Sequence, residues 1–316
     1  MLQFRNQLQE ILKEVRKVII GQDEILESLL MAMFSRGHVL IEGAPGLAKT
    51  TIVNLFSQIL QCPFKRIQFT TDLLPSDIIG INTYNEKTGF HVEKGPIFTS
   101  LLLADEINRA SPKVQSALLE AMEEKQVTIG NETFRLPEPF FVFATQNPLD
   151  SMSTYELPQA QLDRFLFKLI IKYPDLDAEF DIADSVLKGN FKRMKPLLTP
   201  KDIVELQNYI QYVHMDEKLK AYCVQLVDAT RNPGNYKIRY KRYIDYGSGP
   251  RGTFNLIRAA KTRAALSGRD YVIDEDIDKV AHPVLRHRVI LNFEADAKKI
   301  TTTDVIDELL KKCVIP

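Results

Sequence analysis

The sequence predicts an α/β fold with a mostly parallel sheet, followed by a smaller all-helical domain. Five short apolar runs have the length of strands and the near-continuous hydrophobicity of strands that are covered on both faces. They occupy residues 39–41, 64–68, 100–104, 140–144 and 167–171. Stretches with helical periodicity separate most of them, which is the pattern of a parallel sheet. After Tyr173 and Pro174 the strand pattern stops and helical patterns continue. We therefore expect two domains, at residues 1–174 and 175–316.

Length and composition fit this arrangement. The 316 residues correspond to one large or two ordinary domains, and the 45% that are hydrophobic supply a sizeable core. The 41 Lys and Arg residues balance 41 Asp and Glu residues, and a formal charge of zero argues against a strongly electrostatic binder of nucleic acid or membranes. No run approaches the roughly 18 apolar residues of a membrane span, and the N-terminus lacks the apolar core of a signal peptide. We expect a cytoplasmic protein.

Local signals assign the remaining elements in order. Near the N-terminus, apolar residues recur three or four positions apart and predict an amphipathic helix over residues 2–18: Leu8, Ile11, Leu12, Val15 and Val18. The polar segments 83–92 and 126–136 are typical of β-hairpins, because each contains a glycine near its turn. In the second domain, Thr199 followed by Pro200 predicts a helix start with a capping hydroxyl.

A loop of small residues follows the first predicted strand and has the pattern of a phosphate-binding loop. Its residues are Gly43, Ala44, Pro45, Gly46, Leu47, Ala48, Lys49 and Thr50, and a helical stretch begins at Thr51. Small residues let backbone N–H groups surround phosphate oxygens, the lysine reaches the β and γ phosphates, and the threonine hydroxyl can ligate magnesium. Ala48 replaces the second glycine of the usual GxxxxGK[ST] pattern; it is small but would strain a positive φ. An ordinary strand–turn–helix corner is the alternative.

Polar side chains follow two other predicted strands, at the edge where parallel sheets bind ligands. Asp105 and Glu106 end the third strand, and Asn147 follows the fourth. Asp105 is suited to hold magnesium, and Glu106 to orient or deprotonate an attacking water. The Asn147 amide can hydrogen-bond both that water and a γ-phosphate. The alternatives are a helix cap near Ser111 for the two acids and a simple Asn-Pro turn for Asn147.

Two arginines are placed to act on phosphate from outside the loop. Arg164 lies just before the last predicted strand and can project toward the γ-phosphate of a neighbouring subunit. Arg251 begins a helix of the second domain and can reach back to the nucleotide, which would make domain closure depend on the nucleotide's state. For Arg164, the alternative is a surface ion pair with Asp163 worth about 0–1 kcal/mol.

These elements, in this order, resemble an AAA+ ATPase, and the loop sequences narrow the resemblance to the MoxR family. The matching segments are 69–77 (FTTDLLPSD), 103–110 (LADEINRA), 116–122 (SALLEAM) and 157–165 (LP, then QLDRF). The match covers nearly the whole chain. The family commonly carries the same Leu-Ala-Lys-Thr ending of the phosphate loop, which accommodates Ala48. Around Arg251 the sequence GSGPRG departs from the more usual ASPRA, so the start of that helix is looser.

The resemblance implies an AAA+ core with a five-stranded sheet, a helical lid, two inserted hairpins, and hexameric rings that use ATP and Mg²⁺. By the family pattern, Walker A is Lys49 and Thr50, Walker B is Asp105 and Glu106, sensor 1 is Asn147, the arginine finger is Arg164 and sensor 2 is Arg251. Ile20 lies in the segment that touches adenine, and Thr51 follows Walker A in the nucleotide site. MoxR members act as ATP-driven chaperones that mature or activate partner proteins, often ones with von Willebrand factor A domains and metal centres.

Two other functions are compatible with this pattern. A nucleic-acid motor uses similar hairpins with basic tips, but residues 128–133 contain one Glu and no Lys or Arg, and residues 83–92 contain one Lys and one Glu. A nucleotide-switched scaffold with little hydrolysis would require neither Glu106 nor Arg164. The segment 236–246 interleaves four basic residues with four tyrosines. It can be interpreted as a stacking platform for single-stranded bases or as an exposed lid loop that packs on a neighbour.

Overall fold

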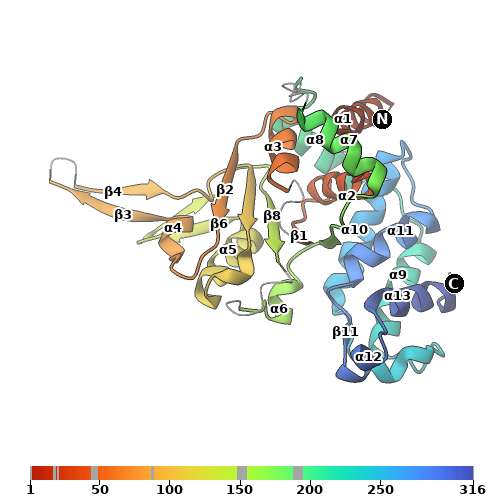
Figure 1. Ribbon diagram of the computed structural model, residues 1–316. Helices are drawn as coiled ribbons and strands as arrows, with labels where there is room; N and C mark the ends of the chain where they lie inside the picture. The colour runs from red at the N-terminus through yellow and green to blue at the C-terminus, as the bar shows by residue number, and fades with distance from the viewer. Residues whose placement is uncertain are drawn as a thin grey trace.

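A five-stranded parallel sheet forms the centre of the first half of the chain (Figure 1). The computed structural model describes residues 2–16, 19, 21–43, 49–86, 89–147, 155–187 and 195–315. The strands lie in the order β2-β5-β8-β1-β9. Their bounds are β1 Val39–Glu42, β2 Phe64–Gln68, β5 Leu101–Asp105, β8 Phe141–Gln146 and β9 Phe167–Ile170. All five predicted strands are confirmed, and because they are parallel their carboxyl ends share one edge of the sheet.

Helices cover both faces of this sheet. Their bounds are α1 Leu2–Arg16, α2 Asp23–Phe34, α3 Lys49–Ile59, α4 Pro75–Ile79, α5 Pro112–Glu124 and α6 Gln159–Leu162. Successive strand residues point to opposite faces. Ile41, Leu103 and Phe143 accordingly pack in one buried core with α1, α2 and α3, while Leu40 and Val142 pack in a second core with α4 and α5. The near-continuous hydrophobicity of β1, β5 and β8 follows from this double coverage. β2 lies at the edge of the sheet, and three of its five residues are exposed.

Both predicted hairpins are present as antiparallel pairs. β3 (Gly80–Asn85) pairs with β4 (Gly89–Lys94), and β6 (Gln126–Ile129) pairs with β7 (Glu132–Arg135). Gly130 has a φ of 61°, the left-handed conformation that a tight hairpin turn favours. In Figure 1 the β3–β4 hairpin projects well away from the central sheet. It therefore presents a surface that is separate from the body of the protein.

The second half of the chain is mainly helical, with one correction to the prediction. Its helices are α7 Leu176–Leu187, α8 Pro200–Gln211, α9 Glu217–Arg231, α10 Pro250–Leu266, α11 Asp274–Leu285, α12 Phe293–Ala297 and α13 Thr302–Lys312. Thr199 caps α8 as predicted. The expectation that strands stop at Pro174 is wrong, because β10 (Ile244–Tyr246) and β11 (Ile290–Leu291) form an antiparallel pair. Strands this short leave no alternating pattern in the sequence. Within the described ranges, no helix has both the length and the apolar character of a membrane span.

The helical half packs against α1 and α2, and one buried core runs through both halves. Ser35 and Thr262 share a hydrogen bond of 2.7 Å between their hydroxyls, and Gln207 Nε2 donates to the Met33 carbonyl at 2.8 Å. α11 contacts β9. Since a common core joins the halves, the domain boundary after residue 174 stays a prediction.

The tyrosine-rich segment 236–246 packs on its own chain. Tyr243 is buried, and the Tyr236 hydroxyl donates to Asp228 Oδ2 at 2.9 Å. The backbone N–H of Arg239 donates to Glu308 Oε1 at 3.0 Å. The expectation of an exposed loop whose rings pack on a neighbouring subunit is wrong for Tyr243, because the helical half already buries this ring. The sequence carries no signal that distinguishes contacts within one chain from contacts with a neighbouring subunit.

His38 connects three elements at the amino-terminal edge of the sheet. Its Nε2–H donates to the Met122 carbonyl of α5 at 3.2 Å, and its Nδ1 accepts the Val142 N–H of β8 at 3.1 Å. The ring is buried, and burial lowers the pKa of His38 to about 4 in spite of the hydrogen bond to Met122. A neutral ring with both nitrogens bonded is a structural histidine, which fixes the edge of the sheet from which β1 begins.

We expect acid to destabilise the protein in part through His38. The unfolded chain protonates this residue below its usual pKa of about 6.5, whereas the folded chain does so only near pH 4. Stability is therefore lost as the pH falls between these values, by about 3 kcal/mol in total. His38→Gln keeps a donor and an acceptor but does not titrate. Its unfolding free energy in urea should fall less between pH 7 and pH 5 than that of the wild type, and an equal fall would contradict this role.

Candidate active site

Three neighbouring strands bring the predicted phosphate-site residues to one edge of the sheet. β8 pairs with β5 on one side and with β1 on the other. Asp105 ends β5, Asn147 follows β8, and the loop after β1 leads to Lys49 at the start of α3. Lys49 interacts electrostatically with both Asp105 and Glu106. The structure therefore brings the side chains of Lys49, Asp105 and Glu106 together, and Asn147 follows the neighbouring strand at the same edge, as the order of the strands predicts.

The two ends of the phosphate loop are described, and its middle is not. Outside the described residues lie Ala44, Pro45, Gly46, Leu47, Ala48 and, in the predicted adenine segment, Ile20. A Cβ on Gly43 would lie 2.9 Å from the Ile171 carbonyl oxygen, so glycine is needed where the loop begins. Lys49 Nζ donates to the Gly43 carbonyl at 2.7 Å. Burial lowers the pKa of Lys49, and the nearby Asp105 and Glu106 oppose this effect.

Thr145 orients both acids from the neighbouring strand. Its Oγ1 donates to Asp105 Oδ1 at 2.7 Å and accepts the Glu106 N–H at 2.8 Å. On its other side, Asp105 Oδ2 accepts hydrogen bonds from Arg66 of β2, at 2.6 Å from Nη2 and 3.2 Å from Nε. Thr145 is fully buried. One hydroxyl thus fixes the carboxylate of Asp105 and the backbone that carries Glu106.

Glu106 occupies a left-handed backbone conformation, with φ 57° and ψ 50°. This conformation is uncommon for residues other than glycine, and when surrounding contacts maintain it the position is often functional. Glu106 Oε2 accepts hydrogen bonds from Gln68 Nε2 and Arg109 Nη1, both at 3.0 Å. The carboxylate is therefore held by protein donors in this arrangement. It must exchange them for a water before it can act as a base.

Thr50 and Asp105 offer oxygen ligands of the kind that Mg²⁺ prefers. Thr50 and Thr51 lie in the first turn of α3, directly after Lys49, and Thr50 is exposed. The Asp105 carboxylate faces the same edge of the sheet and is 16% exposed. Mg²⁺ in nucleotide sites takes one or two such protein oxygens together with waters and phosphate oxygens. The residues present fit this ion, and Arg66 is the group that would compete with it for Asp105.

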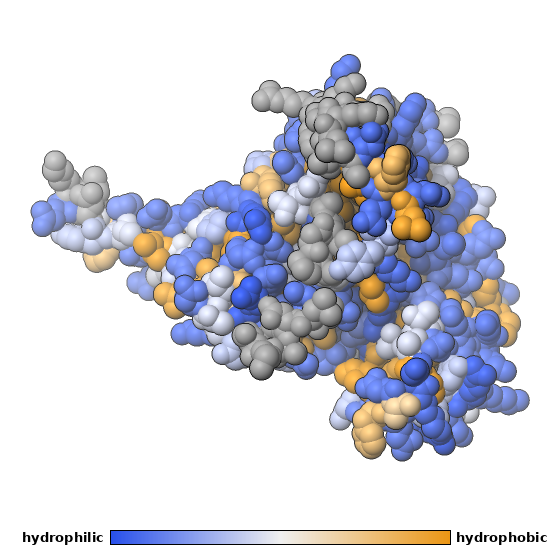
Figure 2. All heavy atoms as spheres, viewed as in Figure 1, coloured by the Kyte–Doolittle hydropathy of each residue, from blue (hydrophilic) through white to orange (hydrophobic). Residues whose placement is uncertain are grey.

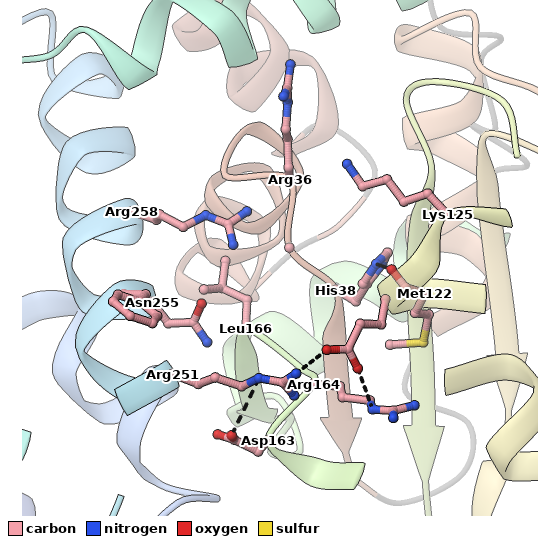
Figure 3. Close-up of a pocket in the computed structure, with 13 residues that line it drawn as sticks. Arg36, His38, Met122, Lys125, Asp163, Arg164, Leu166, Arg251, Asn255 and Arg258 are labelled. Carbon is pink, nitrogen blue, oxygen red and sulfur yellow. Dashed lines mark hydrogen bonds and ion pairs between the residues drawn. The ribbon is translucent and has the colours of Figure 1, made fainter. Parts of the chain in front are cut away.

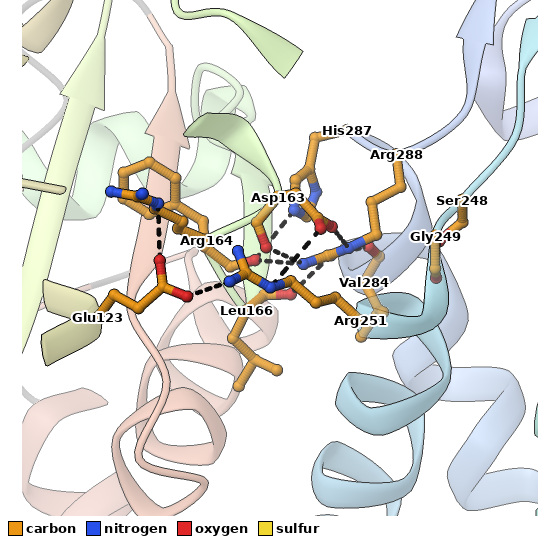
Figure 4. Close-up of polar contacts among 11 residues, drawn as sticks. Glu123, Asp163, Arg164, Leu166, Ser248, Gly249, Arg251, Val284, His287 and Arg288 are labelled. Carbon is orange, nitrogen blue, oxygen red and sulfur yellow. Dashed lines mark hydrogen bonds and ion pairs between the residues drawn. The ribbon is translucent and has the colours of Figure 1, made fainter. Parts of the chain in front are cut away.

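Arg164 and Arg251 converge on one carboxylate, Glu123 of α5 (Figure 4). Arg164 Nε lies 2.9 Å from Glu123 Oε2, and Arg251 Nη2 donates to Glu123 Oε1. Arg251 Nε also lies 4.0 Å from Asp163 Oδ2. The surface pair of Asp163 with Arg164, the alternative from the sequence, is replaced by an ion pair of Asp163 with Arg288 at 2.7 Å. The two arginines thus belong to one cluster, although they come from opposite halves of the chain.

This arginine cluster lies at the amino-terminal edge of the sheet, opposite the phosphate loop. Arg164 precedes β9, and both arginines line a cavity of about 350 Å³ that is bordered by His38, just before β1 (Figure 3). β1 has four residues, which at about 3.3 Å per residue separate its ends by about 13 Å. This arrangement does not support Arg251 reaching back to the nucleotide of its own chain, because Lys49 lies beyond the far end of β1.

Five polar residues of these two clusters were not predicted from the sequence: Arg66, Gln68, Arg109, Glu123 and Thr145. Gln68 and Thr145 carry a usable signal, because both lie at or near the carboxyl end of a strand at the edge where Asp105 lies. Glu123 carries none, since α5 ends in two adjacent glutamates and only the packing of α10 and of the loop before β9 brings one of them to the arginines. The order of residues along the chain therefore does not show which segments become neighbours in the folded protein.

Known proteins are similar to nearly the whole chain. Residues 38–167 match the family model of the ATPase family associated with various cellular activities (AAA), and residues 237–309 match that of the AAA lid domain. Chaperone MoxR1 of Mycobacterium tuberculosis is 42% identical over 98% of this chain and 82% of its own length. Protein MoxR of Methylorubrum extorquens is 34% identical over 88% of this chain and 86% of its own length. A solved structure from Cytophaga hutchinsonii, described as an ATPase, is similar with a TM-score of 0.94 at 46% identity, covering 100% of this chain and 96% of the other.

We expect Thr145→Val to lower ATP hydrolysis about tenfold, since a buried polar group that loses its partner costs about 1–3 kcal/mol. The substitution keeps the shape of the side chain but leaves Asp105 Oδ1 and the Glu106 N–H without the hydroxyl. Hydrolysis rates across a range of Mg²⁺ concentrations measure the effect. Thr145→Ser is the matched control, because it retains the hydroxyl. A valine variant as active as the serine variant would show that Thr145 does not orient the acids.

Proposed function

The chain belongs to the MoxR family of AAA ATPases, and we propose that it couples Mg²⁺-dependent ATP hydrolysis in an oligomeric ring to the remodelling of partner proteins. The observation that carries this proposal is the separation of two half-sites, with Lys49, Asp105 and Glu106 at one edge of the sheet and Arg164 and Arg251 at the other. Phosphoryl transfer needs a phosphate cradle and also cations for the charge on the transferred group. Each chain supplies the cradle for its own nucleotide and the cations for the nucleotide of a neighbouring chain.

In this proposal one chain binds the nucleotide at the carboxyl edge of its sheet. The backbone of the phosphate loop donates hydrogen bonds to phosphate oxygens, and Lys49 neutralises the β and γ phosphates. Thr50 and Asp105 would hold Mg²⁺, which neutralises phosphate charge and orients the γ-phosphate. Arg66 gives up Asp105 Oδ2 when this happens. The loop and the acid thus hold one nucleotide between them.

The same chain prepares the attacking water. Glu106 exchanges Gln68 and Arg109 for a water molecule and accepts its proton as the water attacks the γ-phosphorus. The bond from that phosphorus to the β,γ-bridging oxygen breaks, and ADP leaves with this oxygen. Asn147 supports this step as a donor to the γ-phosphate and an acceptor for the water, since an amide can do both. Release of Glu106 from its two protein donors then becomes a requirement for hydrolysis.

A neighbouring chain completes the site. Its Arg164 exchanges Glu123 for the γ-phosphate, which a guanidinium can bind through two hydrogen bonds. We propose that Arg251 serves this same neighbouring nucleotide, because it shares Glu123 with Arg164. Each chain then offers one loop edge and one arginine edge, and repeated contacts between unlike edges close into a ring. Six subunits is the number that the family resemblance implies.

We propose that the clients are proteins. The β3–β4 hairpin stands clear of the body (Figure 2) and exposes 65% of Tyr84 and 74% of Phe90, whose ring centroids are 5.1 Å apart. Paired exposed rings suit contacts with apolar stretches of a polypeptide. The name of Chaperone MoxR1 supports a chaperone role, and the family resemblance makes proteins with von Willebrand factor A domains candidate clients. We expect the cytoplasm as the compartment, because it supplies ATP.

A nucleic-acid motor fits the hairpins less well. The β6–β7 turn at residues 130–131 is followed by Glu132 and contains no cation. Lys94, at the base of the β3–β4 hairpin, lies 5.0 Å from the ring centroids of both Phe98 and Phe134, so its charge is already engaged. Binding to a phosphate backbone needs several cations on one surface. Membership of an ATPase family also argues against a scaffold with little hydrolysis.

We expect Glu106→Gln to bind ATP and retain it, because an amide cannot accept the proton of the attacking water. Lys49→Ala should bind ATP about 10- to 100-fold more weakly, the effect of losing a charged hydrogen-bond donor. Titration with a fluorescent ATP analogue, followed by a chase with unlabelled ATP, measures both affinity and retention. Tight binding of ATP by Lys49→Ala would overturn the phosphate site.

We expect Arg251→Ala to lower kcat about 10²-fold, as the loss of one charge-stabilising donor does, and to leave binding of ATP to the variant chain itself unchanged. Lys261→Ala is the control, because it removes a cation from the same helix that instead donates to the Gln211 carbonyl at 2.9 Å. Hydrolysis rates and ATP titrations of dilute protein separate the two effects. Weakened ATP binding with unchanged kcat would place Arg251 at the nucleotide of its own chain.

A further inference from the structure

A three-residue segment after α11 binds the loop that carries Arg164. Arg286 Nη1 donates to the Lys168 carbonyl at 3.3 Å, and His287 Nε2 donates to the Phe165 carbonyl at 3.1 Å. Arg288 is the third member of this segment. These donors come from the helical half, and their acceptors are backbone carbonyls at and before β9. Because the acceptors belong to the backbone, these hydrogen bonds fix the path of the loop independently of the side chains in the loop.

Arg288 contacts this loop on both sides of Arg164 (Figure 4). Its Nε donates to Asp163 Oδ1 at 2.7 Å, and its Nη2 donates to the Asp163 carbonyl at 2.9 Å and to the Phe165 carbonyl at 2.6 Å. Its Nη1 donates to the Leu166 carbonyl at 3.3 Å. One guanidinium thus binds the carbonyl immediately before Arg164 and the carbonyl immediately after it.

Arg288 is itself 2% exposed, which rules out a direct role on phosphate. A buried guanidinium requires opposite charge and acceptors in place of water. Burial lowers the pKa of Arg288 to about 10, and Asp163 opposes this effect, so the group is still charged at neutral pH. Its donors are directed to the loop, to Asp163 and, through Nη1, also to the Val284 carbonyl of α11. Arg288 can therefore act only through the residues that it binds.

We propose that Arg288 is a positioning residue for Arg164 and thereby controls hydrolysis at the nucleotide of the neighbouring chain. This inference rests on the proposed function, in which Arg164 acts on that nucleotide. With the carbonyls of residues 163 and 165 bound to one rigid group, the backbone of Arg164 has a single orientation. The side chain then starts from a defined direction, and the loop loses little further freedom when it meets phosphate.

The same contacts link the helical half to the arginine. Asp163 lies between Arg288, at 2.7 Å, and Arg251, at 4.0 Å. Glu123 lies between Arg251 and Arg164. Arg251 belongs to α10, and Arg288 follows α11. A rotation of the α10–α11 pair relative to the sheet therefore moves Arg164 as well, so the position of the lid sets the competence of the neighbouring site.

Substitution of Arg288 tests this role. Arg288→Met removes every donor without adding a buried charge, and should lower kcat about 10²-fold, the cost of a misplacement of about 1 Å, with little change in KM for ATP. Arg288→Lys keeps a positive charge opposite Asp163 but lacks the planar guanidinium with its several donors. Its kcat should lie between those of the wild type and the methionine variant. Arg269→Met is the matched control. Arg269 binds the buried Asp276 at 2.7 and 2.8 Å elsewhere in the helical half, so its loss should lower stability and spare kcat.

Mixed assemblies separate positioning from general damage. Lys49→Ala chains present an intact Arg164 but hydrolyse little, and Arg164→Ala chains bind ATP but present no finger. Mixing these two should restore hydrolysis. Arg288→Met should behave as a finger-deficient chain: hydrolysis returns when it is mixed with Lys49→Ala and does not return when it is mixed with Arg164→Ala.

Each result bears on one of the two claims. Failure of the Lys49→Ala and Arg164→Ala mixture would overturn the shared site itself, independently of Arg288. If that mixture works, three results obtained with Arg288→Met itself overturn the role of Arg288. These are a wild-type kcat for Arg288→Met, its rescue by Arg164→Ala, or its rescue by neither partner, since the last shows loss of the whole chain. A drop in kcat for Arg269→Met as large as that for Arg288→Met would likewise reduce the effect to stability.

Discussion

The direction of the strands is the constraint on which the rest of this molecule depends. All five strands of the central sheet are parallel, so every carboxyl end faces one edge and every amino end faces the other. Lys49, Asp105 and Glu106 lie at the first edge, and Arg164 and Arg251 lie at the second. A strand of four residues keeps these edges about 13 Å apart. A reaction that needs groups from both edges must therefore draw on two chains.

The ion pairs at the arginine edge differ in how easily they exchange. The side chains of Arg164 and Glu123 are 30% and 35% exposed, and a pair of this kind contributes about 0–1 kcal/mol. A phosphate group that carries more charge and accepts two hydrogen bonds can displace Glu123. The pair of Arg288 with Asp163 is different, because the arginine side chain is 1% exposed. Breaking one side of such a pair costs about 3–5 kcal/mol. The Arg164–Glu123 pair can therefore exchange for phosphate, whereas the Arg288–Asp163 pair persists. The persistent pair holds the loop that carries Arg164.

Sequence reasoning succeeded where one segment carries its own signal and failed where distant segments meet. The apolar runs predicted the five strands, and the residue types after β1 and β5 predicted the edge of the sheet at which Lys49, Asp105 and Glu106 meet, because both signals are local. Thr145 and Gln68 were missed because their importance comes from neighbours across the sheet. β10 and β11 are too short to produce a recognisable alternation of apolar and polar residues. The burial of His287 and Arg288 was hidden as well: the sequence Arg-His-Arg is typical of a helix surface, yet here it lies against backbone carbonyls that come from about 120 residues earlier in the chain.

The most direct test of a site shared between chains is the ATPase rate per chain, measured over a range of protein concentrations for the wild type and for Arg164→Ala. The shared site predicts a rate per chain that rises with concentration as chains assemble, and a rate near zero for the variant at every concentration. A constant rate per chain that Arg164→Ala leaves unchanged would mean that each chain holds a complete site, and would contradict the account.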